Sequence, residues 1–393
     1  MLPAAIQQEF TAIHQISNFI HQNPELGFKE FKASAALKKF LAEHGFSIRE
    51  NLGGVETAFL AECASSSADP EIPLFGFLGE YDALAGLGHA CGHNLIATVA
   101  LAALLETRRR LDQEKIPYRL CYIGTPAEET LGGKVKMIEG NAFDGVAASI
   151  EAHPFHKTIP DPGCLSVARC TIAFHGKASH AAIAPEKGIN ALDAICEFVC
   201  AIRRWRPLLG ERERVHGIIT KGGDAPNIIP EYTEAFYYVR AASEQAINPL
   251  KRHLEELAEK AARETGCRAE VKWVSAYKGM VFNAPLNEEF IRAWKERYGA
   301  ELPHTEGTEG KGSSDTGDVS YIMPCAQYYF DVTGGANCAL HTVEFREAAA
   351  SDQAFQSTME TAAAMSDVAF RYFADKEFRQ SVHAAWKTKL AES

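Results

Sequence analysis

The stretch of residues 79–94 reads GEYDALAGLGHACGHN, and it constrains the fold more than any other part of the chain. It follows the short apolar run 74–78, which is typical of a buried strand, and a helix is predicted to begin near Asn94. The glycines of the stretch allow the backbone to turn tightly around a small group. A strand, a glycine-rich loop and a helix in this order indicate an α/β protein with a site at the end of the strand.

The same stretch gathers side chains that bind metals or move protons: Glu80, Asp82, His89, Cys91 and His93. Cys91 and His93 are two residues apart. A thiolate and an imidazole at this spacing can hold one ion or two neighbouring ions, and both suit zinc or another borderline metal. For this pair alone, a buried free cysteine beside a structural histidine is an equally good interpretation.

Composition and charge exclude several classes of protein. The chain has 393 residues, which predicts two or three domains, and its net charge of −11 argues against a nucleic-acid or anionic-membrane partner. Its ten cysteines are scattered, mostly in apolar runs, which favours reduced thiols. No signal peptide and no continuous apolar stretch of about 18 residues is visible. We therefore expect a cytoplasmic protein with no membrane partner.

The order of the predicted elements indicates two domains. Strand-like runs alternate with helical segments up to about residue 160, which predicts a largely parallel sheet flanked by helices, with ligands at the C-terminal strand ends. Residues 166–277 are typical of a small, mainly antiparallel α+β unit with two helices on one face. After Pro285 the α/β pattern resumes. The chain is therefore predicted to have a catalytic domain of residues 1–165 and 278–393, interrupted by an inserted domain of residues 166–277.

Further candidate ligands lie at other predicted strand ends. Glu128 and Glu129 follow an apolar strand; two consecutive carboxylates usually form a solvated turn, but one can bind a metal while its neighbour takes a proton from water. His153 ends another strand and His341 lies in the segment 340–345. Each histidine alone is more often a core or surface residue. Together the donors suit a pair of metals that share a bridging group; they are Cys91, His93, Glu129, His153 and His341.

Seven motifs occur in one order along the chain: GEYDALAGLGHACGHN, GTPAEET, EAHP, HGKASHAA, DAPNIIPEYTEAFYYVRA, GSSDTGDVS and HTVEF. With this combination the chain resembles the di-metal amidohydrolases related to aminoacylase and carboxypeptidase G. Within them it is most similar to the branch of p-aminobenzoyl-glutamate hydrolase, auxin-conjugate hydrolases and aminoacyl dipeptidases. The resemblance extends from His21 to about Phe345, which is nearly the whole chain.

The resemblance implies a zinc-exopeptidase-like α/β fold with an inserted α+β lid and dimerisation domain, and therefore a homodimer. It also implies two divalent metal ions per subunit (zinc or manganese, possibly cobalt), with Glu128 as the general base. Asp82 falls where relatives keep an aspartate that supports a ligand, and we count it with Glu128 among the catalytic residues. In the aminoacylase branch a metal-binding histidine precedes that aspartate by two residues. Here Glu80 has that place, and we do not expect it to be a ligand. The metal ligands implied are Cys91, His93, Glu129, His153 and His341.

Three residues of the inserted domain resemble substrate-binding residues of the family. His180 resembles a histidine that reaches the partner subunit's active site and stabilises the oxyanion. Asn227 and Arg240 resemble the pair that holds a substrate carboxylate, and an arginine fork is a natural bidentate grip for that group. A lone arginine is more often part of a surface salt bridge. The loop 313–318 resembles a substrate-side loop, but an Asx-rich turn explains it nearly as well.

The sequence therefore predicts a metal-dependent hydrolase of the amide bond in a small N-acyl amino acid, such as one like p-aminobenzoyl-glutamate, or in a dipeptide. One alternative is a non-catalytic relative that binds metal or a small acyl amino acid without turnover. The presence of Glu128 and of every implied ligand counts against it. Another alternative is an aminopeptidase that recognises a free amine, which would prefer an acidic residue in the place of Arg240.

Overall fold

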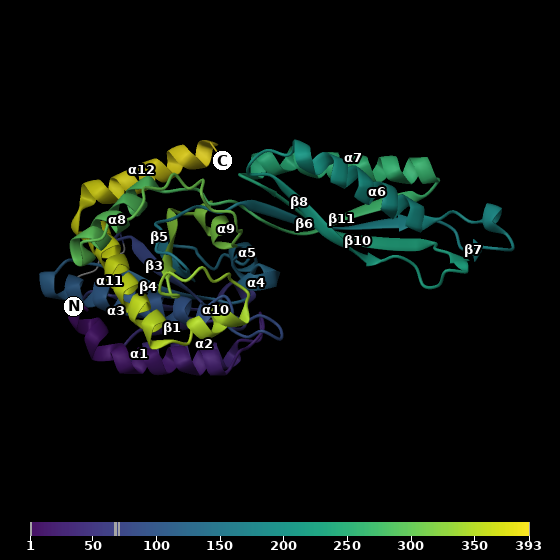
Figure 1. Ribbon diagram of the computed structural model, residues 1–393. Coiled ribbons are helices and arrows are strands. Elements are labelled where there is room, and N and C mark those ends of the chain that lie inside the picture. The colour runs from purple at the N-terminus through teal and green to yellow at the C-terminus, as the bar shows by residue number, and fades with distance from the viewer. Residues whose placement is uncertain (1, 67–68, 70, 393) are drawn as a thin grey trace. The chain divides into compact units, whose positions relative to one another are not determined.

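The computed structural model describes residues 2–66, 69 and 71–392, and the chain folds into two compact units (Figure 1). The larger unit contains the residues up to Gly163 together with Val281–Gly310 and Asp318–Glu392. The inserted unit contains Cys164–Met280 and Lys311–Gly317. The second of these segments is tied to the first by a hydrogen bond from the backbone nitrogen of Leu165 to the carbonyl oxygen of Gly312, 2.8 Å long.

The larger unit contains a six-stranded sheet in the order β1-β2-β4-β3-β5-β12. Strands β4, β3, β5 and β12 are parallel, whereas β1 and β2 run antiparallel at one edge. Strand β3 is buried at every position, as expected for an apolar strand with neighbours on both sides and helices on both faces. The strand bounds are β1 Ser47–Glu50, β2 Phe59–Ala64, β3 Leu74–Glu80, β4 Arg119–Thr125, β5 Val146–Phe155 and β12 Cys325–Asp331.

Helices cover this sheet, and α3 is the central one. It contacts β3, α1 and α11, and its residues Leu95–Leu105 are buried, because the segment is rich in alanine and leucine and permits close packing on every side. The longer helices are α1 Ala4–Gln22, α2 Phe31–Glu43, α3 His93–Glu114, α8 Ala284–Tyr298, α11 Asp352–Ala374 and α12 Lys376–Glu392. The shorter ones are η1 Leu52–Gly54, α4 Glu128–Leu131, α5 Gly133–Glu139, α9 Thr316–Ser320 and α10 Val343–Ala348.

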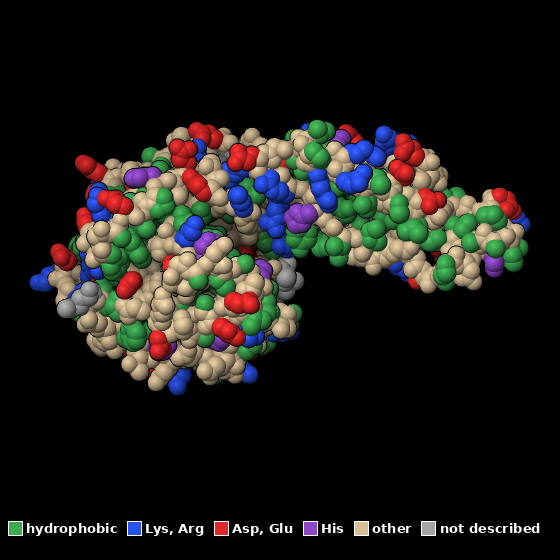
Figure 2. All heavy atoms as spheres, viewed as in Figure 1, with side chains coloured by type: hydrophobic (Ala, Val, Ile, Leu, Met, Phe, Trp, Pro, Cys, Tyr) green, Lys and Arg blue, Asp and Glu red, His purple; other side chains and the backbone are tan. Residues whose placement is uncertain are grey.

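The inserted unit is a four-stranded antiparallel sheet, in the order β11-β6-β10-β8, with helices α6 and α7 on one face. Strand β10 alternates between buried and partly exposed residues, because every second side chain packs against the helices. In the view of Figure 2, charged side chains gather over the two helices, whose outer sides face water. The bounds are β6 Ser166–His175, β7 Ser179–His180, η2 Pro185–Lys187, α6 Ala191–Trp205, η3 Arg206–Leu208, β8 Arg214–Lys221, β9 Ile228–Ile229, β10 Tyr232–Ala241, α7 Glu244–Thr265 and β11 Arg268–Tyr277.

The predicted fold class, a largely parallel α/β sheet flanked by helices, is confirmed. Each of the ten cysteines is a free thiol. Over the described part of the chain, no helix combines the length and the apolar character that a membrane crossing requires.

A buried carboxyl group gives this fold a pH dependence that can be measured. Asp161 is 1% exposed and accepts a hydrogen bond from the backbone nitrogen of Gly163 at 2.7 Å. Burial raises the pKa of Asp161 from 3.8 to about 7. The folded state therefore holds the proton more tightly than the unfolded state. The resulting stabilisation is complete below about pH 4 and is lost as the pH rises to about 7.

We predict that Asp161→Asn removes this part of the pH dependence, because the amide stays neutral. The free energy of unfolding of the parent, minus that of the variant, should fall between about pH 4 and 7 and stay constant above it. The scale is about 1.4 kcal/mol for each unit of pKa difference. Urea unfolding from pH 4 to 8 measures it, and a difference that does not change with pH would contradict the prediction.

Candidate metal centre

The predicted ligands lie where parallel strands of the larger unit end. Strand β3 leads into the loop with Cys91 and then to His93, the first residue of α3. Strand β4 leads to Glu129, strand β5 contains His153, and His341 lies on the loop after β12. Because β4, β3, β5 and β12 are neighbours in this order, ligands that are far apart in sequence meet at one edge of the sheet.

The donor atoms of these five residues form two groups that share one thiol. Cys91, His93 and His153 form the first group, and Cys91, Glu129 and His341 the second; within each, the donor atoms lie within 4.8 Å of one another. The Sγ of Cys91 is 3.4 Å from Nε2 of His153 and 3.3 Å from Nε2 of His341. The structure therefore brings together all five residues that the sequence proposed as ligands, in two groups that could each hold a metal ion.

Asp82 holds two of the contributing segments in place. Its Oδ1 accepts hydrogen bonds from Nδ1 of His93 at 3.0 Å and from the backbone nitrogen of Glu128 at 3.2 Å. Its Oδ2 accepts from the backbone nitrogen of Glu129 at 3.1 Å. With Nδ1 of His93 donating to Asp82, the Nε2 atom presents its lone pair to the cluster, which is the usual arrangement around a metal-binding histidine. Asp82 is thus a positioning residue.

His153 is oriented in the same way by the backbone. Its Nδ1 donates to the carbonyl oxygen of Pro154 at 2.8 Å, so Nε2 faces the thiol of Cys91. Burial, followed by the charge of His93, lowers the pKa of His153 to about 4. The imidazole is therefore neutral near pH 7 and can offer a lone pair to a cation.

The backbone around the cluster adopts conformations that ordinary residues avoid. Ala127, just before Glu128, and His341 both have φ near +63°, in the left-handed region, and such strain gathers at functional sites. At Gly92 (φ +77°) an added Cβ would lie 2.6 Å from Cγ of Pro154, so that position requires glycine. These constraints fix where the loops present their side chains.

Negative charge in a buried setting dominates the electrostatics. Burial opposes the protonation of His93, but the charges of Asp82 and Glu80 raise its pKa well above its usual value. Burial raises the pKa of the Cys91 thiol well above its usual range. Burial would raise the pKa of Glu129 as well, but a hydrogen bond from His341 and the charge of His93 lower it. Surroundings that favour a charged histidine also favour a metal cation.

The residues fit a pair of divalent cations. Among the described residues, three buried polar atoms of the cluster lack a hydrogen-bond partner: Oε2 of Glu80, Nε2 of His93 and Oε1 of Glu129. Atoms of this kind cost free energy unless a ligand satisfies them. A thiolate, imidazoles and a carboxylate suit zinc, and imidazole and carboxylate groups also bind manganese.

The sequence interpretation missed the position of Glu80 and the part that Lys134 plays. Both are fully buried; Lys134 forms an ion pair with one carboxylate oxygen of Glu80, and the other oxygen lies 3.4 Å from Nε2 of His93. A lysine in the segment GGKVKMIE resembles a solvated residue. The available signal was its i, i+3 spacing from the buried Met137, which places both on the inner side of α5.

The three predicted substrate residues lie in the inserted unit. His180 is exposed on β7, opposite Ile228 of β9, and the backbone nitrogen of Ala181 donates to the carbonyl oxygen of Asn227 at 3.0 Å. His180 and Asn227 are therefore neighbours. Arg240 lies near the far end of β10, and its Nη1 donates to Oγ of Ser313 at 2.6 Å. At about 3.3 Å per residue, Tyr232 at the start of β10 lies roughly 26 Å from Arg240 along the strand, and Asn227 comes before that start.

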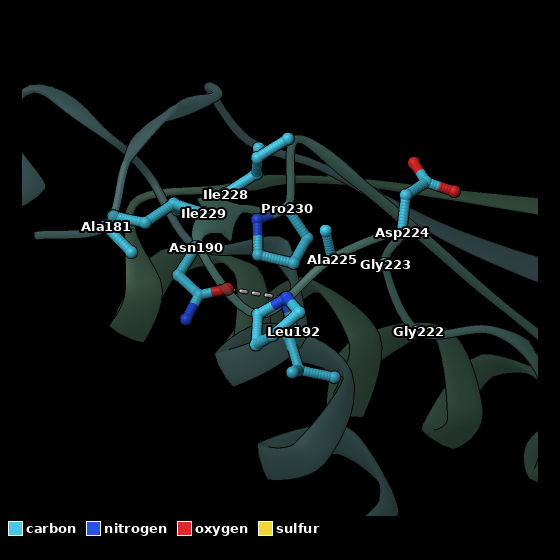
Figure 3. Close-up of a pocket in the computed structure, with 11 residues that line it drawn as sticks. Ala181, Asn190, Leu192, Gly222, Gly223, Asp224, Ala225, Ile228, Ile229 and Pro230 are labelled. Carbon is cyan, nitrogen blue, oxygen red and sulfur yellow. Dashed lines mark hydrogen bonds between the residues drawn. The ribbon is translucent and has the colours of Figure 1, made fainter.

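A cavity of about 410 Å³ lies beside the loop that carries Asn227. Figure 3 shows its walls, including Asn190, whose side chain accepts a hydrogen bond from the backbone nitrogen of Leu192 at the start of α6. Asp224 is the one charged residue among those that line it. The lining residues all belong to the inserted unit, whereas the candidate metal cluster belongs to the larger unit.

Comparisons with known proteins agree with this geometry. Residues 166–266 match a family model described as a peptidase dimerisation domain. The chain is 36% identical to the Xaa-Arg dipeptidase of Mus musculus, over 96% of this chain and 89% of that protein. It is 30% identical to a component of the p-aminobenzoyl-glutamate hydrolase of Escherichia coli (strain K12), over 74% of this chain and 63% of that protein.

The fold is shared with solved structures. A dinuclear metal-binding peptidase of the M20 family from Bacillus subtilis matches with a TM-score of 0.69 at 20% identity, over 93% of this chain and 99% of that chain. Aminobenzoyl-glutamate utilization protein from Klebsiella pneumoniae matches with a TM-score of 0.70 at 16% identity, over 94% and 98%. Because the similarity to the mouse dipeptidase extends over nearly the whole of both chains, this protein belongs to the M20 family of metallopeptidases and is a hydrolase of amide bonds.

Proposed function

We propose that this protein hydrolyses the amide bond of a dipeptide or a small N-acyl amino acid with the help of two divalent cations, zinc or manganese. The observation that carries the proposal is the pair of donor groups that share Cys91 and lie beside Glu128. The names of the relatives, Xaa-Arg dipeptidase and p-aminobenzoyl-glutamate hydrolase, support these two substrate classes.

Cys91 would serve both cations, with His93 and His153 on one side and Glu129 and His341 on the other. When bound, the cations would lower the pKa of a water molecule and polarise the scissile carbonyl group. The chain itself orients the side chains that would bind the cations. Asp82 fixes the ring of His93 and the backbone of Glu129, so these two ligands keep their positions while the substrate changes.

Glu128 is the general base in this proposal. It is 9% exposed, and a carboxylate oxygen lies within 4.8 Å of donor atoms of His93 and Glu80. Its neighbour Glu129 lies near both His93 and His341, with oxygens 3.7 Å and 3.4 Å from their Nε2 atoms. Glu128 would accept a proton from the attacking water and later donate it to the leaving amine.

Arg240 would hold the carboxylate of the substrate. Burial and then the charge of Arg169 lower the pKa of Arg240, yet a guanidinium stays charged at neutral pH. Since β10 separates Arg240 from Asn227, we infer that His180 and Asn227 act in the site of a partner subunit, in a homodimer. The match to a dimerisation domain supports this inference. The free thiols favour a reducing compartment, and we propose the cytoplasm.

The first prediction concerns Glu128→Gln, which keeps the shape of the side chain and removes the proton acceptor. We expect kcat for an Xaa-Arg dipeptide to fall by about 10²- to 10⁴-fold, while the metal content stays that of the parent. Activity assays on metal-reconstituted enzyme and metal analysis measure this. Glu139→Gln, at an exposed residue at the end of α5, is the matched control and should change neither quantity. A Glu128→Gln enzyme with the parent rate would contradict the role of Glu128.

A second prediction concerns Asp82→Asn. The amide cannot accept hydrogen bonds on both sides, so His93 and the backbone of Glu129 lose their common anchor. We expect metal affinity to fall by about 10- to 100-fold. Chelator competition measures it, and Glu106→Gln, at a buried glutamate of α3 that pairs with Arg109, is the control. Unchanged affinity in the folded variant would show that Asp82 does not position the ligands.

A third prediction concerns Arg240→Met and the substrate carboxylate. The parent should cleave a dipeptide about 10- to 100-fold better, in kcat/KM, than its C-terminal amide, because hydrogen bonds to a charged group contribute about 1.5–3 kcal/mol. In Arg240→Met this preference should disappear, whereas Arg268→Met, at an exposed arginine of β11, should keep it. If Arg240→Met still preferred the free carboxylate by the parent's factor, another residue would hold that group.

A further inference from the structure

The two carboxylate oxygens of Glu80 have different surroundings. It is the last residue of β3 and is fully buried. The Oε1 atom forms an ion pair with Nζ of Lys134. The Oε2 atom has no hydrogen-bond partner among the described residues and lies 3.4 Å from Nε2 of His93. One oxygen is therefore held by the protein, and the other is turned toward the candidate metal centre.

Three buried polar atoms that carry lone pairs lie around Nε2 of His93: this atom itself, Oε2 of Glu80 and Oε1 of Glu129. Nδ1 of His93 donates to Asp82, which leaves the lone pair of Nε2 directed at Oε2 of Glu80. In the part of the chain that the structure describes, Oε1 of Glu129 also lacks a hydrogen-bond partner, and it lies 3.7 Å from the same Nε2. Nε2 of His93 therefore faces two buried carboxylate oxygens, and this grouping is stable only when a proton or a metal cation lies between Nε2 and those oxygens.

We propose that Glu80 is a sixth protein ligand of the dinuclear centre, on the side of His93, and that Lys134 is the positioning residue that holds it. This inference rests on the metal centre of the proposed function.

The surroundings of Lys134 explain why a buried lysine is present. Its Nζ pairs with Glu80 and lies 3.8 Å from Oε1 of Glu151, whose Oε2 accepts from Nε2 of Gln327 at 2.8 Å. A buried ammonium group is costly unless carboxylates surround it. Lys134 is one cation beside two carboxylates, and a metal cation bound to the outer oxygen of Glu80 would add positive charge on the side that faces the candidate metal centre. The ion pair also keeps Glu80 from turning both oxygens to the metal.

The test uses the full chain stripped of metal and titrated with Co²⁺. The parent and the control Glu106→Gln should each bind two Co²⁺ per subunit. In Glu80→Gln one ion should keep the parent's affinity, the Kd of the other should rise by about 10- to 100-fold, and the visible ligand-field spectrum should change. Chelator competition and absorption spectroscopy give these quantities without any measurement of activity.

A folded Glu80→Gln protein with the parent's two affinities and spectrum would overturn the ligand role while leaving the metal centre intact. A parent that bound no Co²⁺ would overturn the metal centre itself, and the two failures are thus distinguishable.

The role of Lys134 needs a second variant, because Lys134→Gln alone would leave Glu80 buried without its cation. Glu151 keeps its hydrogen bond from Gln327 in either case. The double variant Glu80→Gln/Lys134→Gln removes one charge of each sign. If Lys134 acts only through Glu80, the double variant should bind Co²⁺ as weakly as Glu80→Gln does, with the same spectrum. A further tenfold loss in the folded double variant would overturn this role.

Discussion

The hydrogen bonds of Asp82 are the interactions on which the rest of the centre depends. A single buried carboxylate joins the side chain of His93, at the start of α3, to the backbone of the loop after β4. The two segments follow the neighbouring strands β3 and β4, so a shift of Asp82 would move candidate ligands on both at once. Burial would raise the pKa of Asp82, but the charge of His93 and these hydrogen bonds lower it. The group is therefore a fixed anion, and the ligands are arranged around it.

The centre concentrates carboxylates and a thiol where water is largely absent, and the protein compensates for this charge in two ways. Lys134 compensates part of it directly, through Glu80. His93 compensates another part, because its carboxylate neighbours raise its pKa despite burial. A proton on His93 and a metal cation would compete for the same Nε2 lone pair. The negative charge of the candidate site favours cations, and the donor types there would decide which metal it binds.

Sequence reasoning predicted the fold class from local patterns. It predicted that the candidate ligands meet from their places at strand ends together with the family resemblance. The apolar run before Glu80 predicted β3, and alternating strands and helices predicted parallel strands with ligands at one edge. What it could not supply is how each polar atom is satisfied. The spacing of Glu80, Asp82 and His93 shows three groups that can bind metal. Only the structure shows that both oxygens of Asp82 accept hydrogen bonds, whereas one oxygen of Glu80 has no hydrogen-bond partner among the described residues. Lys134 was missed because lysine side chains are usually exposed to water, and the sequence alone does not show that this one is buried.

The inserted unit imposes a limit that the motifs alone did not reveal. The two ends of a long strand lie far apart. Asn227 comes before the start of β10, and Arg240 lies near the end of that strand. Side chains at the two ends of one strand cannot grip the same small carboxylate. If Asn227 and Arg240 hold one substrate, they must come from two chains. Because the segments of His180 and Asn227 are paired, His180 and Asn227 would then reach the partner's site together. In that case dimerisation is a requirement of the chemistry, because a monomer would hold the metals and the general base but only part of the substrate grip.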